Sequence, residues 1–479
     1  MHSERRILIN TAIFTSGELL GQLANFMFVA LFARAFGVNV MAHYSLGMAV
    51  GGLLAILVDF GTAGFLTRES ARNPRRAREL VGLLLPTQAP LALLLWGLSI
   101  GISAWLLDLR AGLLVLASAC GYQLLSRLSL LLFAPFVGTE KIGGAALAGA
   151  VHRFVTLALG ALAIFYGCGP QLASCALLAG GVLLFVWALV LFVRGFGVPH
   201  WRVAPIAAFA LRKEGSAYAR LSALNVAIDR GGLIVLSGLA GREAVGLYAI
   251  ADRIVVAPAL LPIMFVNAVY PALLRLANES AERVHALTVR CARLLFVGTI
   301  PVATLLTLLA PDIVVLLFGR NFEPAVGALQ VLAWTIPMDG VRQLLGVQLL
   351  ALDQQAAATR VRAFSLGVLI VSCVILILCG FGFKGAACAE LISESFAVLW
   401  YLLLLRRSQS VAALIRSMLA PLFAAAVTFP AATMFTTRLT LGPRACALAV
   451  LILLALLATG SIRLHDLRFL REVLSRPRR

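Results

Sequence analysis

Long apolar runs separated by short polar segments repeat along this chain from one end to the other. A helix needs about 20 predominantly apolar residues to cross a bilayer. On that criterion the pattern predicts fourteen spans, at residues 7–33, 41–66, 80–106, 112–135, 142–166, 171–193, 214–239, 244–270, 288–318, 325–350, 361–381, 385–405, 412–435 and 443–462. The pattern therefore predicts an all-α polytopic membrane protein.

Composition and charge agree with this prediction. Of the 479 residues, 61% are hydrophobic and 13% charged. In soluble proteins, about a quarter of the residues are charged. A net charge of +19 is also typical of nucleic-acid-binding proteins, but here the basic residues lie in short loops. With the N-terminus inside, cytoplasmic segments hold 27 of the 40 Lys and Arg residues, outer loops seven and spans six. This bias predicts two cytoplasmic termini and no nucleic-acid partner.

The stretches around residues 25–46 and 229–250 resemble each other at an offset of 204 positions. The matched pairs are Gly37 with Gly241, Tyr44 with Tyr248, Leu46 with Ile250, and Asn25 with Asp229. The second half is therefore predicted to begin near Glu214 as a copy of the first. Because six spans per half is an even number, both copies enter the membrane in the same sense.

The expected organisation is two pseudo-symmetric six-helix lobes plus two extra helices. The N-lobe, residues 1–198, contains spans one to six. The C-lobe, residues 199–405, contains spans seven to twelve, and an amphipathic interfacial connector at Phe196–Lys213 joins the lobes. Residues 406–479 contain the last two spans and a basic cytoplasmic tail. A short loop at Ala240–Ala244 is expected between spans seven and eight.

Polar residues form stripes along two corresponding spans. The first span has five at intervals of four, three, four and three, which places them on one helical face: Thr11, Thr15, Glu18, Gln22 and Asn25. The seventh span repeats this feature with Tyr218, Ser222, Asn225 and Asp229, while Arg220 and Arg230 lie toward a neighbouring face. Hydrogen bonds between helices are one interpretation. Two stripes in corresponding spans, both with ionisable members, favour a polar central cavity.

For other ionised residues within or near the spans, pairing with a nearby residue is an alternative to a role in the cavity. Asp59 either has a role in the cavity or pairs with Arg68 or Arg72 in the adjacent basic loop. Asp339 and Arg342 have the spacing of an i, i+3 pair on one helix. Glu390 and Glu394 share a face and are expected to make a polar contact inside the C-lobe.

Catalytic and nucleotide-binding motifs are absent from the sequence. It has no phosphate-binding loop of the G-x-x-x-x-G-K-[ST] type, no H-E-x-x-H or G-x-S-x-G motif, and no Cys/His cluster for a metal. We therefore expect a transporter without a cofactor rather than an enzyme. Exchange, or a proton or sodium gradient, would drive it.

Several motifs resemble those of the bacterial polysaccharide flippases, in the superfamily that also contains the lipid II flippase and the multidrug and toxin extrusion exporters. The segment Gly37–Tyr44 is similar, although Gly37-Val38-Asn39 replaces the usual Gly-Pro-Glu. The other matching segments are Asp59-Phe60-Gly61 with Thr67-Arg68-Glu69 and Ala71-Arg72, Ala310-Pro311-Asp312-Ile313 with Leu317-Phe318-Gly319, Phe322, Ala325-Val326 and Leu329-Gln330, and Gly385-Ala386 through Leu391-Ile392-Ser393-Glu394.

This resemblance implies a V-shaped pair of lobes in the bacterial inner membrane, with a cationic cavity for an undecaprenyl-diphosphate-linked oligosaccharide. The last two spans would form a groove for the polyprenyl tail. Implied partners are the lipid-linked oligosaccharide, membrane lipids and other polysaccharide assembly proteins, and the implied products are O-antigen, lipopolysaccharide or exopolysaccharide. A lipid II flippase and a cation-coupled multidrug exporter are the alternatives.

No site residue is carried over from the family, so candidates come from their placement in the spans. The expected substrate-binding residues are Arg230, Arg220, Arg253, Glu18, Gln22 and Asn25. The expected cavity or coupling residues are Asp59, Asp229, Asp252, Arg127, Arg153, Asp339 and Arg342.

Overall fold

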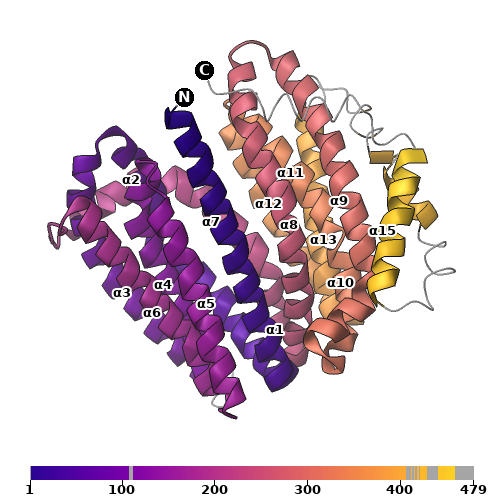
Figure 1. Ribbon diagram of the computed structural model, residues 1–479, viewed down its shortest axis with the longest axis horizontal. Coiled ribbons are helices and arrows are strands. Elements are labelled where there is room, and N and C mark those ends of the chain that lie inside the picture. Colours follow the sequence, from indigo (N-terminus) through magenta and orange to yellow (C-terminus); the bar gives the residue numbers. More distant parts are fainter. Residues whose placement is uncertain are drawn as a thin grey trace. The chain divides into compact units, whose positions relative to one another are not determined.

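The computed structural model (Figure 1) describes residues 2–106, 112–405, 412, 415, 418–419, 421–428 and 441–458. Every regular element within these ranges is a helix. The chain divides into two compact units, Met1–Ala249 and Ile250–Arg479.

In the first unit, a single left-handed glycine joins the two helical arms of α1 (His2–Asp59). Gly37 has φ 76° and ψ −174°, so the first two expected spans are the two arms of one bent element. The matched Gly241 has φ 81° and starts α8 (Gly241–Ala277) directly after α7 (Pro205–Leu239) and Ala240. Glycine adopts this conformation without steric strain. The expected loop at Ala240–Ala244 is therefore wrong, because α8 already starts at Gly241, whereas the two matched glycines share a positive φ.

The second arm of α1 ends earlier than its apolar run. Hydropathy predicts a span to residue 66, but the helix ends at Asp59, and Phe60 and Gly61 both have positive φ. The chain then continues as α2 (Thr62–Arg72). The rest of the unit consists of a 3-10 turn, η1 (Pro74–Arg76), followed by α3 (Ala77–Leu106), α4 (Leu113–Gly138), α5 (Gly143–Phe165), α6 (Pro170–Phe196) and α7.

Helix α4 is the centre of this unit, because α1, α2, α3 and α6 all pack against it. Figure 1 shows α3, α4, α5 and α6 side by side. Gly47 and Gly51 of α1, spaced four apart, lie directly on the backbone of α4 at Leu116 and Cys120. Small residues at this spacing let two membrane helices approach closely.

We expect Gly51→Ala to destabilise this helix contact. A methyl group at Gly51 would lie 2.8 Å from Cys120 Cα and 3.0 Å from Cys120 O, both backbone atoms. Such overpacking costs about 1 to 3 kcal/mol. The control is Gly52→Ala, whose added carbon has its nearest contact at 3.6 Å, with Gln123 Nε2. Thermal unfolding of the purified protein should show a lower midpoint for Gly51→Ala alone, and equal midpoints would contradict the prediction.

The segment between α6 and α7, residues 197–204, is shorter than the predicted connector because α7 already begins at Pro205. It is attached to the start of α3. His200 N donates to Arg78 O at 3.4 Å, Arg202 N donates to Gly82 O at 3.0 Å, and Arg78 Nε donates to Val198 O. A Cβ on Gly82 would lie only 2.2 Å from His200 O, so the close approach requires glycine there.

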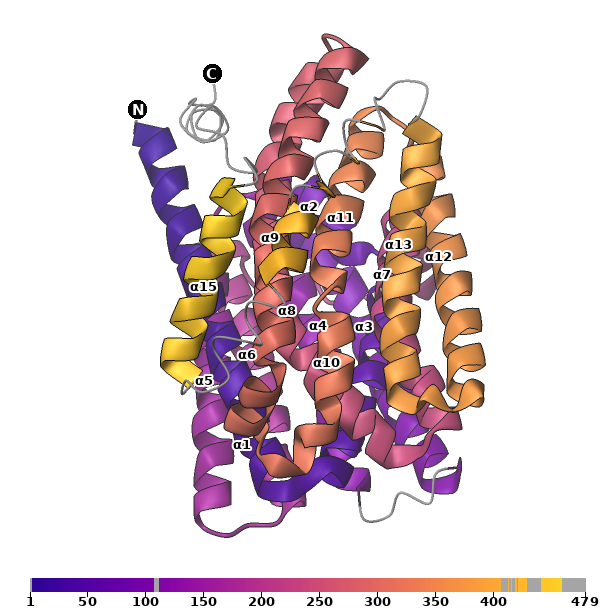
Figure 2. The same ribbon diagram turned by 90° about the vertical axis from the view of Figure 1, so that its right-hand side faces the viewer.

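The second unit contains the rest of α8, then α9 (Ala281–Phe318), η2 (Arg320–Ala325), α10 (Val326–Leu332), α11 (Thr335–Ala351), α12 (Gln355–Leu376), the π-turn η3 (Ile377–Phe381), α13 (Gly382–Leu405) and α15 (Leu441–Ala458). Figure 2 shows α12 and α13 side by side. Helix α15 packs on α9, where Arg444 Nη1 lies 2.7 Å from Asp312 Oδ2.

The tenth expected span, residues 325–350, is wrong as one continuous helix. It is divided into α10 and α11 by a tight turn at Ala333 and Trp334. Pro337 has no backbone N–H to donate to Ala333 O, so the helix is interrupted there and restarts with Pro337 in the first turn of α11.

Nine stretches of the described residues are long and apolar enough to cross a membrane. Gln355–Leu405 contains two of the predicted spans, and Gly17–Asp59 includes most of two others. Half of the predicted span 412–435 lies outside the described residues, and α15 covers most of the last span. The total of fourteen therefore stays a prediction.

Candidate functional site

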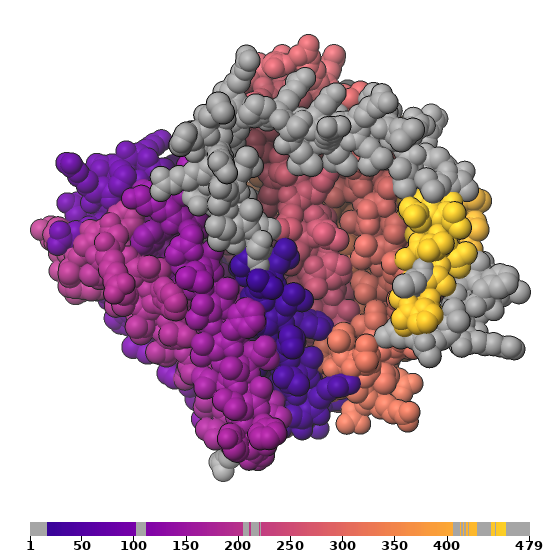
Figure 3. Space-filling model, viewed as in Figure 1, coloured from indigo at the N-terminus to yellow at the C-terminus, as the bar shows by residue number. Residues whose placement is uncertain are grey.

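A half-buried polar cluster on α1 and α5 lies in the first unit; we call Glu18, Gln22 and Arg153 the Glu18 cluster. Glu18 Oε1 accepts hydrogen bonds from Gln22 Nε2 at 3.0 Å and from Arg153 Nη1 at 2.9 Å. The Arg153 side chain is 17% exposed and that of Glu18 40%. A Cβ on Gly21 would lie 2.8 Å from Arg153 Nη1, so the guanidinium lies against the bare backbone of α1. Figure 3 shows the surfaces of α1 (indigo) and α5 adjoining.

His152, next to Arg153, fixes the rotation of α5. Its Nδ1 is 3.0 Å from Ala148 O, and its Nε2 is 3.2 Å from the Tyr122 hydroxyl of α4. A carbonyl only accepts, so Nδ1 carries the hydrogen, and Nε2 of the neutral ring accepts from Tyr122. The ring is buried among these partners. This anchor holds α5 so that the next residue, Arg153, reaches α1.

Asp59 and Arg127 stabilise the turn between α1 and α2. Asp59 Oδ1 accepts hydrogen bonds from Ala63 N at 2.9 Å and from the Thr62 hydroxyl at 3.0 Å. The carboxylate thus provides an acceptor for a backbone N–H group in the first turn of α2, where no helical carbonyl is available. Arg127 Nη1 lies 3.7 Å from Asp59 Oδ2. The charge partner of Asp59 is therefore Arg127 of α4 rather than Arg68 or Arg72. The contacts of both predicted cavity residues indicate a structural role.

The predicted cationic residues of α7 are not part of the Glu18 cluster. Arg220 is exposed and Arg230 half-buried, and within the described part of the chain no hydrogen bond or ion pair connects either to Glu18, Gln22 or Arg153. In the second unit, Arg253 has a buried Nη2 without a hydrogen-bond partner among the described residues.

The other predicted polar positions differ in exposure. Asn25 and Asp252 are half-buried, and Asp229 is exposed. The side chains of Thr11, Thr15 and Tyr218 lie outside the described residues.

Four charged residues form a buried charge network in the second unit: Asp339 and Arg342 of α11, Arg362 of α12 and Glu394 of α13. Arg342 contacts Asp339 and Glu394, and Arg362 Nη1 donates to Glu394 Oε1 at 3.1 Å. Side-chain exposure is only 2% for Arg362 and 7% for Glu394. The predicted Asp339–Arg342 pair and the internal contact of Glu394 are confirmed.

Arg362 is a residue that sequence reasoning missed. It lies at the start of the eleventh predicted span, where a basic residue is typical of a cytoplasmic boundary. Its partner, Glu394, is 32 positions away in the sequence, so no local spacing links the two residues. The shared helical face of Glu390 and Glu394 indicated that α13 makes an internal polar contact, but it did not identify Arg362 as the partner.

The two charged clusters differ in what they can bind. The buried charge network is neutral, with two carboxylates and two guanidinium groups that satisfy one another. Arg153 has further N–H donors besides the one on Glu18, and its cluster is partly open. Of these two, the Glu18 cluster is thus the one able to accept an anionic ligand.

Comparison with solved structures identifies the fold. The lipid II flippase MurJ in its inward closed conformation matches with a TM-score of 0.75 and 14% identity, covering 96% of this chain and 100% of that one. An inward-facing MATE family multidrug transporter matches with a TM-score of 0.59 and 15% identity, covering 84% and 98%. This protein is therefore an all-helical, multi-pass membrane protein with the MurJ and MATE fold.

Sequence comparison identifies the family. The probable low-salt glycan biosynthesis flippase Agl15 of Haloferax volcanii is 23% identical over 395 residues, which are 80% of this chain and 79% of that protein. Residues 7–277, more than half of the chain, match the family model described as "Polysaccharide biosynthesis protein". The chain thus belongs to the polysaccharide biosynthesis protein family and is a transporter of the flippase type rather than an enzyme.

Proposed function

We propose that this protein is a flippase that moves an undecaprenyl-diphosphate-linked oligosaccharide from the inner to the outer leaflet of a bacterial inner membrane by alternating access. The match of residues 7–277 to the polysaccharide biosynthesis family carries the proposal. A relative named as a glycan biosynthesis flippase, similar over four fifths of the chain, supports it. In this proposal both termini are cytoplasmic and an ion gradient or exchange drives transport.

The chemistry of the half-buried cationic residues suits a diphosphate. A guanidinium makes bidentate, charge-assisted hydrogen bonds to phosphate oxygens, and it stays charged when water is partly excluded. Arg153 in the Glu18 cluster and Arg230 on α7 both meet this condition. We assign both to headgroup binding, with Arg220 and Asn25 as further contacts. Of the acidic residues, Asp229 and Asp252 are proposed to take part in ion coupling.

A multidrug exporter is the less favoured alternative. Such a transporter needs a carboxylate that is available to a cationic compound, but Glu18 is already paired with Arg153 at 2.9 Å. A lipid II flippase differs from our proposal in the headgroup carried on the polyprenyl diphosphate. The likeness to MurJ, at 14% identity, supports the fold without choosing between the two.

Deletion of the gene tests the proposed function. We expect loss of surface polysaccharide, unchanged drug tolerance, and accumulation of the lipid-linked oligosaccharide with its headgroup on the cytoplasmic face, measured by enzymatic labelling of sealed vesicles. Loss of viability with accumulation of lipid II would instead identify a cell-wall precursor flippase. Loss of drug tolerance with normal polysaccharide would identify an exporter.

Arg230 provides a residue-level prediction. On a helix, Asp229 and Arg230 point about 100° apart, so they cannot neutralise each other face to face. If Arg230 binds the diphosphate, Arg230→Ala should reduce transport severely and Arg230→Lys only partly, both at normal abundance in the membrane. Polysaccharide export and membrane abundance are measured together. Full export by Arg230→Ala at normal abundance would refute the role, and reduced abundance would assign Arg230 to the fold.

A further inference from the structure

An arginine-rich surface lies on the first unit where α2 ends, α3 begins and α6 ends. Two stretches of the chain form it, residues 72–78 and residues 194–203, and we call it the basic surface. Together the two stretches contain no acidic residue and six arginines: Arg72, Arg75, Arg76, Arg78, Arg194 and Arg202. Such a concentration of one charge attracts an anionic partner.

Hydrogen bonds hold the two stretches of the basic surface together. Arg78 Nε donates to Val198 O. Arg202 N donates to Gly82 O, one turn further along α3, at 3.0 Å. A Cβ on Gly197 would lie 3.6 Å from Arg78 Cζ, so the Arg78 guanidinium also lies against this glycine. Arginines that are far apart in the sequence are therefore brought to one surface.

Most of these guanidinium groups are open to a ligand. Arg76 is paired with Glu69 at 2.5 Å, and Arg78 is used by the bond to the backbone. The other four are exposed, and their side chains form no ion pair or hydrogen bond with the part of the chain that the structure describes: Arg72, Arg75, Arg194 and Arg202. Because like charges held close together repel one another, binding of an anion stabilises this arrangement.

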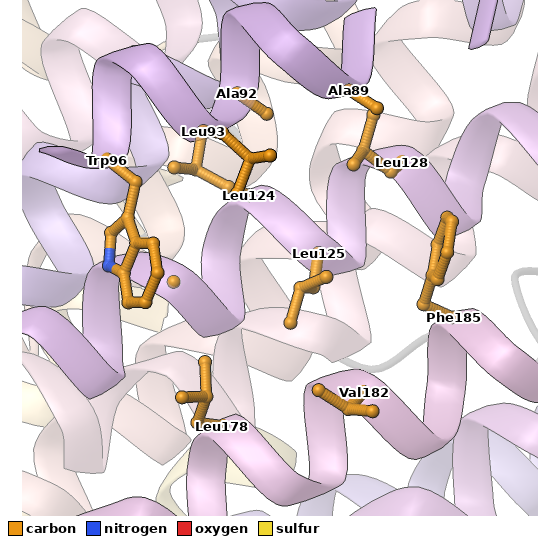
Figure 4. Close-up of a pocket in the computed structure, with 11 residues that line it drawn as sticks. Ala89, Ala92, Leu93, Trp96, Leu124, Leu125, Leu128, Leu178, Val182 and Phe185 are labelled. Atoms are coloured by element: carbon orange, nitrogen blue, oxygen red, sulfur yellow. The ribbon is translucent and has the colours of Figure 1, made fainter. Parts of the chain in front are cut away.

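The basic surface lies at the headgroup level of the membrane. Helix α3 has 30 residues and is therefore about 45 Å long, close to the thickness of a bilayer with its headgroup regions. Near the middle of this helix, residues 89–96 line a groove of apolar side chains (Figure 4). The start of α3, with residues 72–78 just before and within its first turn, is thus at the edge of the hydrocarbon, where phosphate groups lie.

Exposed apolar side chains accompany the arginines. Val198 and Trp201 are each 53% exposed, and Val203 is 77% exposed. Tryptophan is enriched at the membrane–water interface, where one end of the ring is in contact with lipid. A free anion would neutralise the arginines but leave these three side chains in water. An amphipathic anion, with a phosphate and attached acyl chains, covers both kinds of group.

The net charge of the headgroup decides which phospholipid fits. A zwitterionic headgroup carries its own ammonium group, which the unpaired arginines repel. A guanidinium makes bidentate, charge-assisted hydrogen bonds to phosphate oxygens, and basic segments next to a membrane are attracted to anionic lipids. A phospholipid with a net negative charge is therefore the complementary partner.

We propose that the basic surface binds the headgroup of an anionic bilayer phospholipid of the phosphatidylglycerol class. The phosphate pairs with the unpaired arginines, and the acyl chains lie beside Val198, Trp201 and Val203. The bound lipid attaches the segment between α6 and α7 to the membrane surface. The site shares no residue with the Glu18 cluster and does not depend on the identity of the transported glycan.

Native mass spectrometry of the full-length protein tests this site with two double variants that remove the same charge. Arg75→Gln with Arg202→Gln neutralises two unpaired arginines of the basic surface. The control, Arg283→Gln with Arg360→Gln, neutralises two exposed arginines of the second unit that are predicted to lie on the same side of the membrane. Delipidated protein is titrated with dioleoylphosphatidylglycerol and, separately, with dioleoylphosphatidylcholine. We expect the wild type and the control to retain phosphatidylglycerol preferentially, and the Arg75 and Arg202 variant to retain it about tenfold more weakly.

Three results of these titrations would overturn the proposal. Equal loss of phosphatidylglycerol in the two double variants would show an effect of net charge rather than a site. Equal retention of the two phospholipids by the wild type would exclude recognition of the headgroup charge. In a parallel titration, stronger retention of undecaprenyl phosphate that Arg75→Gln with Arg202→Gln alone abolishes would assign the surface to a polyprenyl carrier.

Trp201 fluorescence tests the same site in a bilayer. The other five tryptophans are replaced by phenylalanine, and the protein is placed in phosphatidylcholine nanodiscs with a small fraction of brominated lipid. Quenching should be stronger with brominated phosphatidylglycerol than with the same fraction of brominated phosphatidylcholine, because the site concentrates the anionic lipid beside Trp201. Arg75→Gln with Arg202→Gln should remove this difference. Equal quenching by the two brominated lipids before that change contradicts the proposal.

Discussion

Glu394→Gln is expected to remove most of the folded protein from the membrane, and Asp339→Asn to remove much less. Glu394 contacts both Arg342 and Arg362, so its neutralisation leaves two buried guanidinium groups with a single carboxylate. Breaking a buried ion pair by removing one partner costs about 3 to 5 kcal/mol, because the remaining charge stays desolvated. Asp339 contacts only one of the arginines and is more exposed, at 23% against 7%. Its loss leaves Arg342 paired with Glu394.

The comparison is made on tagged variants by measuring monodisperse protein after mild solubilisation, together with the thermal midpoint. A third variant, Arg362→Met with Glu394→Met, replaces the 3.1 Å pair by apolar side chains of similar length. Such replacements are often neutral or stabilising when both charges are removed. Because Arg342 still pairs with Asp339 in this variant, we expect more folded protein than in Glu394→Gln. A wild-type yield of Glu394→Gln would show that the network contributes little to stability, and a loss in Asp339→Asn as large as in Glu394→Gln would contradict the unequal roles of the two carboxylates.

Hydropathy and local spacing predicted much of the helical framework. The repeat matched Gly37, which separates the first two spans, with Gly241, and both have a positive φ that favours glycine. The Asp339–Arg342 pair was predictable because a spacing of three on one helix brings two side chains together in any tertiary context.

The remaining errors have two physical causes. Hydropathy measures the polarity of side chains and is insensitive to backbone breaks, so the end of α1 at Asp59 and the interruption before Pro337 were missed. Long-range pairing is set by how helices rotate against one another. The partner of Glu18 is 135 positions away, and Arg153 faces α1 because His152 anchors α5 to Tyr122. The spacing of residues within one span does not determine how that helix is rotated against its neighbours.

The first and second units use charge in different ways. In the second unit, two carboxylates and two guanidinium groups neutralise one another around the buried side chains of Arg362 and Glu394, which is suited to holding α11, α12 and α13 together. In the first unit, Glu18 and Arg153 are partly open, and the pair leaves most donors of Arg153 unused. If the proposed function is correct, the role of Glu18 is to position Arg153, and Arg153 is the group that touches the substrate.

This division of roles predicts unequal effects of two substitutions in one ion pair. Arg153→Ala removes the charge-assisted hydrogen bonds to a diphosphate, so transport should fall by about ten- to a hundredfold at normal membrane abundance. Glu18→Gln keeps an oxygen that can accept from Arg153 and releases the guanidinium from a competing carboxylate. We expect it to change transport only a fewfold. The assay is flipping of a fluorescent diphosphate-linked lipid in reconstituted vesicles, with the amount of reconstituted protein measured in parallel. A purely structural pair would give similar losses in both variants, accompanied by lower abundance, and that result would remove Arg153 from the substrate site.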